Sequence, residues 1–317
     1  MHAVTIEDGR LRWAERADPV PGTGELLVAV EAAGLNAADL LQLAGRYPPP
    51  PGAPADVPGL ECAGVVAAVG AGVTRFAPGD RVMGLLGGGG QAELAILHER
   101  VAVPVPAGCP AEQAGGFCEA FATAHDALFS QGGLGMGERL LVTGAAGGVG
   151  TAAVQLGVAA GAQVAASVRD PGLREAVAAF GAEVVEPGAV ARHGPYDLVL
   201  ELVSGPGFAE SFSSLATAGR LVVIGVGAGA RVELSLGELM AGRQTLRGST
   251  LRARTLEEKA TVLRALERHV LPLLAAGRLR VPVAQRFELA DAANAYARFA
   301  SGGKLGKIVL VAHSSVT

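Results

Sequence analysis

The spacing of apolar residues along this chain changes near residue 111, which predicts two parts of different architecture. Before that point, strand-like apolar runs at 26–32, 63–69 and 81–85 are separated by Pro- and Gly-rich turns, a pattern typical of a small β-rich, barrel-like domain. After it, nearly continuous apolar strands alternate with helical segments, which indicates a parallel sheet covered on both faces. The sequence therefore predicts an α/β protein whose second part is a Rossmann-type, doubly wound domain.

The expected elements of the later part follow in regular alternation. In chain order they are a helix at 119–129, strands at 140–143, 163–168, 197–203 and 220–224, and helices from 151, at 171–180 and at 208–216. A long helix at 256–274, a strand at 284–289, a helix at 291–300 and a strand at 307–311 complete the chain. This tail is too short to fold alone, so we expect it to return and complete the first domain.

A Gly-rich turn follows the strand that ends at Thr143. It has the form Ala145-x-Gly147-x-x-Gly150, a dinucleotide fingerprint with alanine in the first position. The first amides of the following helix would point at an anion above the turn, and the helix dipole favours negative charge there. We therefore predict that the turn residues bind a pyrophosphate; the alternative is a Gly-rich turn with no ligand. The residues concerned are Ala146, Gly147, Gly148 and Val149.

The end of the second strand of this domain selects the nicotinamide coenzyme. Val168 is not acidic there, and Arg169 follows it immediately. Arg169, Arg174 and the Ser167 hydroxyl would contact a 2′-phosphate, which favours NADPH over NADH. Asp170 is explained as the N-cap of the next helix.

Composition narrows the class of protein. With 317 residues the chain is long enough for two domains, and only 4% of its residues are aromatic. The net charge of −4 and the lack of a basic tract give no support to a nucleic-acid partner. No apolar stretch approaches the ~18 residues of a membrane span and no leader pattern is evident, so a cytoplasmic protein is expected. Three cysteines without a C-x-x-C pair suit a reducing compartment.

Several motifs occur together in one order, at 34–40, 58–66, 76–82, 145–150 and 306–310. With them the chain resembles the zinc-free, zeta-crystallin-like quinone oxidoreductases of the medium-chain dehydrogenase/reductase superfamily. Segments 46–52 and 248–254 are most similar to the subgroup of the tumour-suppressor-inducible NADPH quinone oxidoreductase.

The resemblance implies a GroES-like catalytic domain formed by residues 1–118 and 256–317. It also implies a Rossmann NADPH-binding domain over 119–255, hydride transfer in the cleft between the two, and a homodimer.

The same resemblance implies that no metal is bound. Zinc-dependent relatives have a histidine where this chain has Leu60 and a cysteine near Asn36, and their four-cysteine lobe is missing between Gly90 and Gln91. A catalytic zinc needs about three protein ligands with N or S donors, and Glu61 and Cys62 cannot supply that set. Without such a Lewis acid, alcohol oxidation is disfavoured, whereas quinones and conjugated enones accept hydride readily.

Two polar residues are candidates for the reacting site. Asn36 would hydrogen-bond a ribose hydroxyl or a substrate carbonyl, unless it is only a turn residue. Tyr47 would orient the acceptor or donate a proton, directly or through water, unless its ring merely packs on the following prolines.

Further coenzyme contacts are implied on the nicotinamide side. Thr123 would bind the carboxamide or the phosphate region, with an ordinary helical threonine as the alternative. Ile224, Gly225 and Val226 would lie along the nicotinamide at the carboxyl end of a strand, unless Gly225 is a plain turn. Arg252 would reach the coenzyme or the domain junction, or be a solvated charge.

The expected function is therefore reduction of a quinone by NADPH without zinc. A reductase of α,β-unsaturated carbonyls is the alternative enzyme, and an NADPH-binding protein without catalysis is the alternative outside enzymes.

Overall fold

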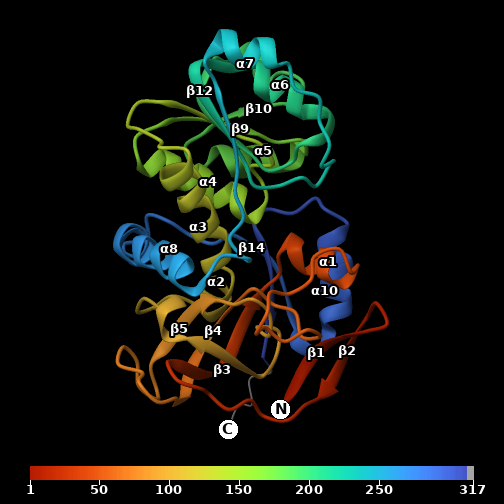
Figure 1. The fold of residues 1–317 in the computed structure, drawn as a ribbon, viewed down its shortest axis with the longest axis vertical. Helices are drawn as coiled ribbons and strands as arrows, with labels where there is room; N and C mark the ends of the chain where they lie inside the picture. The colour runs from red at the N-terminus through yellow and green to blue at the C-terminus, as the bar shows by residue number, and fades with distance from the viewer. Residues whose placement is uncertain (313–317) are drawn as a thin grey trace. The chain divides into compact units, whose positions relative to one another are not determined.

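The computed structural model describes residues 1–312 (Figure 1), which form two compact units. The first unit consists of Met1–Ala122, Leu251–Gly302 and the chain from Lys307, and the second of Thr123–Thr250 and Gly303–Gly306. These boundaries lie four or five residues from the expected ones. That residues 303–306 belong to the second unit was not expected. They belong to it because the Gly306 amide donates to the Ala146 carbonyl over 2.7 Å. Residues 313–317 of the expected first domain lie outside the described part.

The second unit contains a six-stranded sheet in which every neighbouring pair is parallel. Its strands are β8 (Arg139–Val142), β9 (Gln163–Ser167), β10 (Glu183–Val185), β11 (Tyr196–Glu201), β12 (Leu215–Val223) and β13 (Thr245–Gly248). The spatial order is β10-β9-β8-β11-β12-β13, so the chain runs outward in one direction from β8 and in the other from β11. This is the strand order of a doubly wound dinucleotide-binding sheet, and the predicted fold class is confirmed.

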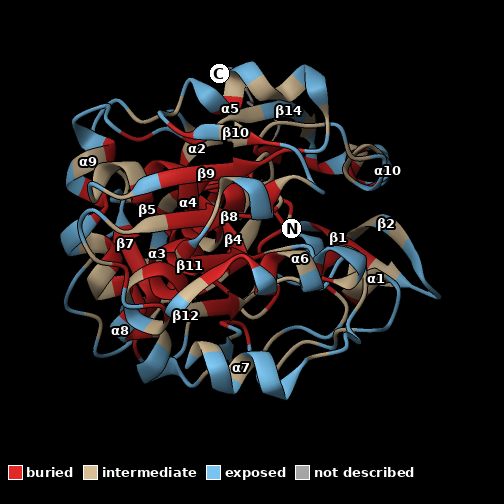
Figure 2. Cartoon of the chain, turned by 90° about the horizontal axis from the view of Figure 1, so that it is seen from above, coloured by how far each residue is buried: buried red, intermediate tan, exposed pale blue. Residues whose placement is uncertain are grey.

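The helices of the second unit connect these strands. They are α4 (Gly148–Ala159), α5 (Arg174–Ala178), α6 (Phe208–Ser213) and α7 (Leu236–Gly242), with a π-helical turn at Asp126–Gln131 and 3₁₀ turns at Pro171–Leu173, Val190–His193 and Gly205–Gly207. The central strands β8 and β11 are buried, whereas α7 is mainly exposed (Figure 2). Burial on both faces explains why the inner positions of these strands are Leu and Val.

The first unit is built on a seven-stranded sheet and a separate hairpin. Its strands are β1 (His2–Glu7), β2 (Arg10–Glu15), β3 (Glu25–Gly34), β4 (Glu61–Val69), β5 (Arg81–Leu85), β6 (Leu94–His98), β7 (Ala102–Pro104), β14 (Val283–Glu288) and β15 (Lys307–Val311). The order is β14-β15-β3-β4-β5-β7, and β6 also pairs with β3. The last strand thus lies antiparallel to β3 and completes the sheet.

The helices of the first unit are short except for α8. They are α1 (Ala37–Leu43), α2 (Ala111–Gly115), α8 (Leu256–His269), α9 (Leu271–Ala275) and α10 (Ala292–Ala300), with 3₁₀ turns at Glu99–Val101 and Leu289–Asp291; α3 (Cys118–His125) begins in this unit and continues into the second. Thr255 and Glu258 form a capping box that starts α8. The single helix expected at 256–274 is wrong: it breaks at Val270, because Pro272 has no amide to continue the hydrogen-bond ladder.

Other elements also differ from the sequence expectations. The helix expected at 208–216 ends at Ser213, because Leu215 already pairs with Tyr196 as the start of β12. The hairpin β1–β2 and helix α1 were not predicted. No helix within residues 1–312 is both long enough and apolar enough to span a bilayer.

Candidate functional site

The strand order of the second unit reverses between β8 and β11, and two polar side chains lie at this point. Thr143 follows β8 and Glu201 ends β11, and both are buried. The Thr143 hydroxyl donates to Glu201 Oε1 over 2.7 Å and accepts from the Leu202 amide over 2.8 Å. In sheets of this kind ligands bind outside the carboxyl ends of the strands at such a reversal.

Glu201 fixes the loop that follows β11. Its Oε1 also accepts from the amides of Val203 (2.8 Å) and Ser204 (2.7 Å), while its buried Oε2 has no hydrogen-bond partner. Ser204 has a φ of 57°, which is strained for a residue with a side chain, and its hydroxyl donates to the Gly225 carbonyl over 3.0 Å. The carboxyl end of β11 is thus held to the segment after β12.

The Gly-rich turn between β8 and α4 presents unoccupied donors. Helix α4 starts after Gly147 without a side-chain cap or an acidic residue in its first turn. Within the described chain, the first-turn amides of Gly148, Val149 and Gly150 donate to no carbonyl. A Cβ at Gly150 would lie 2.3 Å from the Gly144 oxygen, so glycine is required for this close turn. The arrangement suits a phosphate anion.

The end of β9 places the residues expected to choose the coenzyme. Asp170 caps the following 3₁₀ turn by accepting from the Gly172 amide over 2.9 Å, as predicted. Arg169 is exposed and makes no hydrogen bond or ion pair within residues 1–312. Arg174 instead pairs with Glu186, and Ser167 is buried.

The residues expected near the nicotinamide differ in their surroundings. Thr123 Oγ1 is buried without a hydrogen-bond partner, so its hydroxyl remains to be satisfied. Gly225 tolerates no side chain, because a Cβ would lie 2.3 Å from the Leu202 oxygen. Ile224 is half-buried and Val226 is exposed at the same end of β12.

A buried polar cluster occupies the first unit. Lys307 Nζ donates to Glu61 Oε1 (2.6 Å), Asn36 Oδ1 (2.6 Å) and the Leu35 carbonyl (2.8 Å). Asn36 Nδ2 donates to Glu61 Oε1 and to the Gly34 carbonyl, and Glu61 Oε2 accepts from an amide of α3. Lys307 and Glu61 are 3% and 1% exposed, so every proton of this ammonium is satisfied away from water.

Two more acids lie next to this cluster. Burial raises the pKa of Asp39 to about 6, against hydrogen bonds from the amides of Asn36 and Gly59 that lower it. Burial and the nearby Glu61 carboxylate raise the pKa of Glu119 to about 8. Within residues 1–312 the Glu119 carboxyl makes no hydrogen bond, and its raised pKa favours the protonated form at neutral pH.

Arg252 holds the loop that carries Tyr47. Its guanidinium donates to the carbonyls of Gly87 (2.9 and 2.8 Å) and Tyr47 (3.0 Å) and to Gln42 Oε1 (2.6 Å). It also lies 5.0 Å from the centre of the Tyr47 ring. Arg252 is therefore buried in the first unit rather than solvated, and four of its five protons are occupied by protein atoms.

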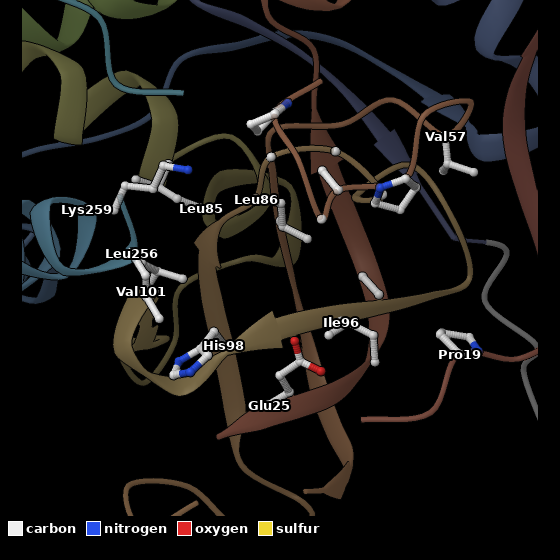
Figure 3. A pocket seen from close by; sticks show the side chains of 18 of the residues that line it. Pro19, Glu25, Val57, Leu85, Leu86, Ile96, His98, Val101, Leu256 and Lys259 are labelled. Carbon is white, nitrogen blue, oxygen red and sulfur yellow. The ribbon is translucent and has the colours of Figure 1, made fainter. Parts of the chain in front are cut away.

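A pocket of about 470 Å³ opens next to this clamp within the first unit. It is lined mainly by apolar groups from the loop after Tyr47, from the chain after β5 and from the start of α8. In Figure 3, Lys259 and Leu256 lie on one side of the pocket, and Val57 and Pro19 on the other. Its volume is in the range of small-molecule sites.

The donor set does not suit a metal ion. The described residues contain no group of three His, Cys, Asp or Glu side chains able to hold one. Leu60 is a buried hydrophobic residue, and Glu61 is occupied by Lys307. Burial raises the pKa of Cys62 to about 12 and that of Cys118 well above its usual value, which opposes the thiolate that a metal binds.

Sequence reasoning assigned no role to Glu61, Lys307 or Glu201. The first two lie in the motifs at 58–66 and 306–310, each a charged residue at the start of an apolar strand. Glu201 similarly ends an apolar strand. A charge at the edge of a strand buried on both faces must be paired, and that rule would have singled them out.

Comparison with known families agrees with this architecture. A model described as "Alcohol dehydrogenase GroES-like domain" matches residues 22–107, and one described as "Zinc-binding dehydrogenase" matches residues 173–310. The GroES-like first unit is thereby confirmed.

Curated relatives differ widely in length. Prostaglandin reductase-3 of Bos taurus is 34% identical over 266 residues, covering 80% of this chain and 67% of that protein. A mycocerosic acid synthase-like polyketide synthase of Mycobacterium tuberculosis is 33% identical over 306 residues, covering 92% of this chain. The chain spans only 14% of the length of that synthase.

Solved structures resemble the whole described fold. A mycobacterial protein complexed with NADPH has a TM-score of 0.87 and 28% identity, with 98% of this chain and 100% of that chain covered. A structure described as a mycobacterial quinone oxidoreductase has a TM-score of 0.84 and 28% identity, with 98% and 99% covered. The two family matches, the bovine relative and these structures lead to one conclusion: the chain belongs to the medium-chain dehydrogenase/reductase superfamily of oxidoreductases.

Proposed function

We propose that this protein is an NADPH-dependent, zinc-independent reductase of quinones. The observation that carries the proposal is the open turn before α4, where three amides at a helix N-terminus have no partner beside the reversal point of a doubly wound sheet. The resemblance to a mycobacterial protein that binds NADPH and to a quinone oxidoreductase supports it.

The second unit would hold the coenzyme through groups that the fold leaves unsatisfied. The turn residues 146–149 would bind the pyrophosphate, and the orphaned Thr123 hydroxyl would bind the carboxamide or phosphate region. Ile224, Gly225 and Val226 would line the nicotinamide. NADPH would supply the hydride; the chain's part is to orient the coenzyme and exclude water.

Preference for NADPH would rest on Arg169. The Asp170 carboxylate accepts a hydrogen bond from the Gly172 amide as a cap. The neighbouring Arg169 is exposed and pairs with no carboxylate in the described chain, so its guanidinium can bind a 2′-phosphate. Arg174 would contribute less because it already pairs with Glu186. Ser167 would add a hydrogen bond.

The first unit would supply the acceptor side. Both Asn36 amide protons are used by Gly34 and Glu61, so its remaining capacity is one lone pair on Oδ1, which suits a coenzyme ribose hydroxyl better than a substrate carbonyl. Tyr47 would orient the acceptor or donate a proton to its oxygen. Arg252 would act by holding the Tyr47 loop rather than by touching the coenzyme.

The donor chemistry supports the proposed zinc independence. The three ligands that a catalytic zinc requires are not gathered among the described residues, and Glu61, which follows Leu60, already neutralises Lys307. A quinone needs no Lewis acid, because the charge that develops on its oxygen is delocalised around the ring.

A conjugated enone is the second candidate acceptor. The specific observation in its favour is the 34% identity to a prostaglandin reductase. Tyr47 would orient an enone as it would a quinone.

Steady-state oxidation of NADPH by the purified chain tests the proposal. We expect turnover with 1,4-naphthoquinone that survives dialysis against a chelator, and weaker turnover with a trans-2-alkenal. A higher kcat/KM with the alkenal would favour the enone reductase. Tight NADPH binding without turnover of either acceptor would instead support a non-catalytic NADPH-binding protein.

A further inference from the structure

One lysine that lines the pocket of the first unit has no hydrogen-bond or ion-pair partner for its ammonium. The chain has only three lysines, at 259, 304 and 307. Lys307 belongs to the buried cluster and Lys304 donates to the Gly306 carbonyl over 2.8 Å. Lys259, in the first turns of α8, lines the pocket, and its ammonium makes no hydrogen bond or ion pair within residues 1–312.

The groups around Lys259 leave its charge uncompensated. Glu119 and Arg252 are the charged or titratable groups that act on it most strongly. The raised pKa of Glu119 favours its neutral form at pH 7, which weakens its attraction for Lys259, and Arg252 is itself a cation held by backbone carbonyls. Glu25, an acid of the pocket lining, accepts from the Gly22 amide and lies away from Lys259 in Figure 3.

The side chain of Lys259 is also partly shielded from solvent. It is half-buried, and burial lowers the pKa of its ammonium. A cation in an apolar pocket gains most from an anion that enters with a ligand, because both charges then meet in a medium of reduced dielectric.

We propose that this pocket holds the apolar body of an acceptor that bears a carboxylate, and that Lys259 pairs with that carboxylate. The inference rests on the proposed function and specifies its substrate class: an amphipathic quinone or enone with an acidic substituent. Leu85, Leu86, Val101 and Leu256 contact the apolar body, and Lys259 sets its orientation from the α8 side of the pocket.

A matched pair of substrates tests the proposal by kinetics. The pair is 3-(1,4-naphthoquinon-2-yl)propanoate and its methyl ester, which share the same ring and differ in one charge. We expect the wild-type protein to favour the acid about tenfold in kcat/KM, as one favourable ion pair would give. Lys259→Met should abolish that preference and leave the ester unchanged, while Lys259→Arg should retain most of it.

The control removes a charge elsewhere. Arg10 is exposed on the β1–β2 hairpin, and Arg10→Met should leave the ratio of acid to ester as in the wild type. An acid-to-ester ratio unchanged by Lys259→Met, or an equal loss with both substrates, would overturn the inference, since the lysine stem would then only cover apolar surface.

Binding separates this inference from the proposed function. If neither quinone is turned over, titration calorimetry with the same acid and ester, in wild-type and Lys259→Met protein, still measures recognition. If the acid binds the wild-type protein but not Lys259→Met, the carboxylate site is supported and only the quinone reductase activity is refuted. If acid and ester bind equally to both proteins, the carboxylate site is refuted.

Discussion

The buried cluster of the first unit and the strand edge of the second unit satisfy their polar groups in opposite ways. Around Lys307, three protons of an ammonium meet three oxygens, and both oxygens of Glu61 are occupied. At the edge of the second sheet, three helix amides, one oxygen of Glu201 and the guanidinium of Arg169 have no partner in the described chain. Polar groups whose hydrogen bonds are all made within the chain indicate a stabilising role. Polar groups that have no partner within the chain indicate a place where a ligand binds.

The largest effect is expected from breaking the satisfied cluster. Lys307→Met leaves the Glu61 carboxylate buried without its counter-ion, and we expect a loss of roughly 3–5 kcal/mol in the free energy of unfolding. Denaturant titration monitored by circular dichroism measures it. The double variant Lys307→Met/Glu61→Gln should recover most of the loss, because no charge is then stranded. A loss under about 1 kcal/mol in the single variant would mean that the pair is not a stabilising element.

The next effect concerns the unsatisfied edge. Arg169→Ala should raise the KM or Kd for NADPH about ten- to a hundredfold, the value of one lost charge-assisted interaction, and leave NADH within about twofold. Arg174→Ala is the matched control and should change NADPH affinity far less, since Arg174 is paired with Glu186. An equal decrease in affinity for both coenzymes would refute the 2′-phosphate assignment.

Glu119 combines features of both regions: it lies next to the hydrogen-bonded cluster around Lys307, but its own carboxyl makes no hydrogen bond within the described chain. Its pKa in the folded state, about 8, lies above its ordinary value of 4.5. The unfolded chain therefore releases this proton first, and the folded state loses stability as pH rises from about 4.5 to about 8. Glu119→Gln should accordingly stabilise the protein measurably at pH 8 and hardly at all at pH 4.5.

Unfolding titrations of both proteins at the two pH values measure this difference. A stabilisation that is the same at pH 4.5 and 8 would show that ionisation of Glu119 is not its cause.

The smallest effect is expected at Tyr47. If its hydroxyl donates a proton to the acceptor, Tyr47→Phe should lower kcat by about tenfold while the KM for NADPH stays constant. Solvent isotope effects on kcat in both proteins check whether proton transfer has slowed. An unchanged kcat on several acceptors would reduce Tyr47 to a ring packed beneath Arg252.

The sequence predicted the parallel sheet, the Gly-rich turn and the cap at Asp170, because each rests on local patterns of residues. It did not predict the break at Val270, where a single proline overrides a strongly helical segment. The hydrogen-bond partners of the Asn36 and Arg252 side chains could not be predicted from the sequence either. Apart from the Gly34 carbonyl beside Asn36, these partners come from segments 25 to 271 and 165 to 210 residues away in the chain, and only the tertiary fold brings them together.

The interleaving of the two units along the chain has a consequence for biosynthesis. The path passes from one unit to the other at 122/123, 250/251, 302/303 and 306/307, so no single cut yields either unit intact. On the ribosome, β3 has to wait for β15 before its sheet is complete, whereas all six strands of the other sheet emerge earlier. Rossmann strands should therefore assemble first during translation, and the GroES-like unit should mature only after its last strand has been made.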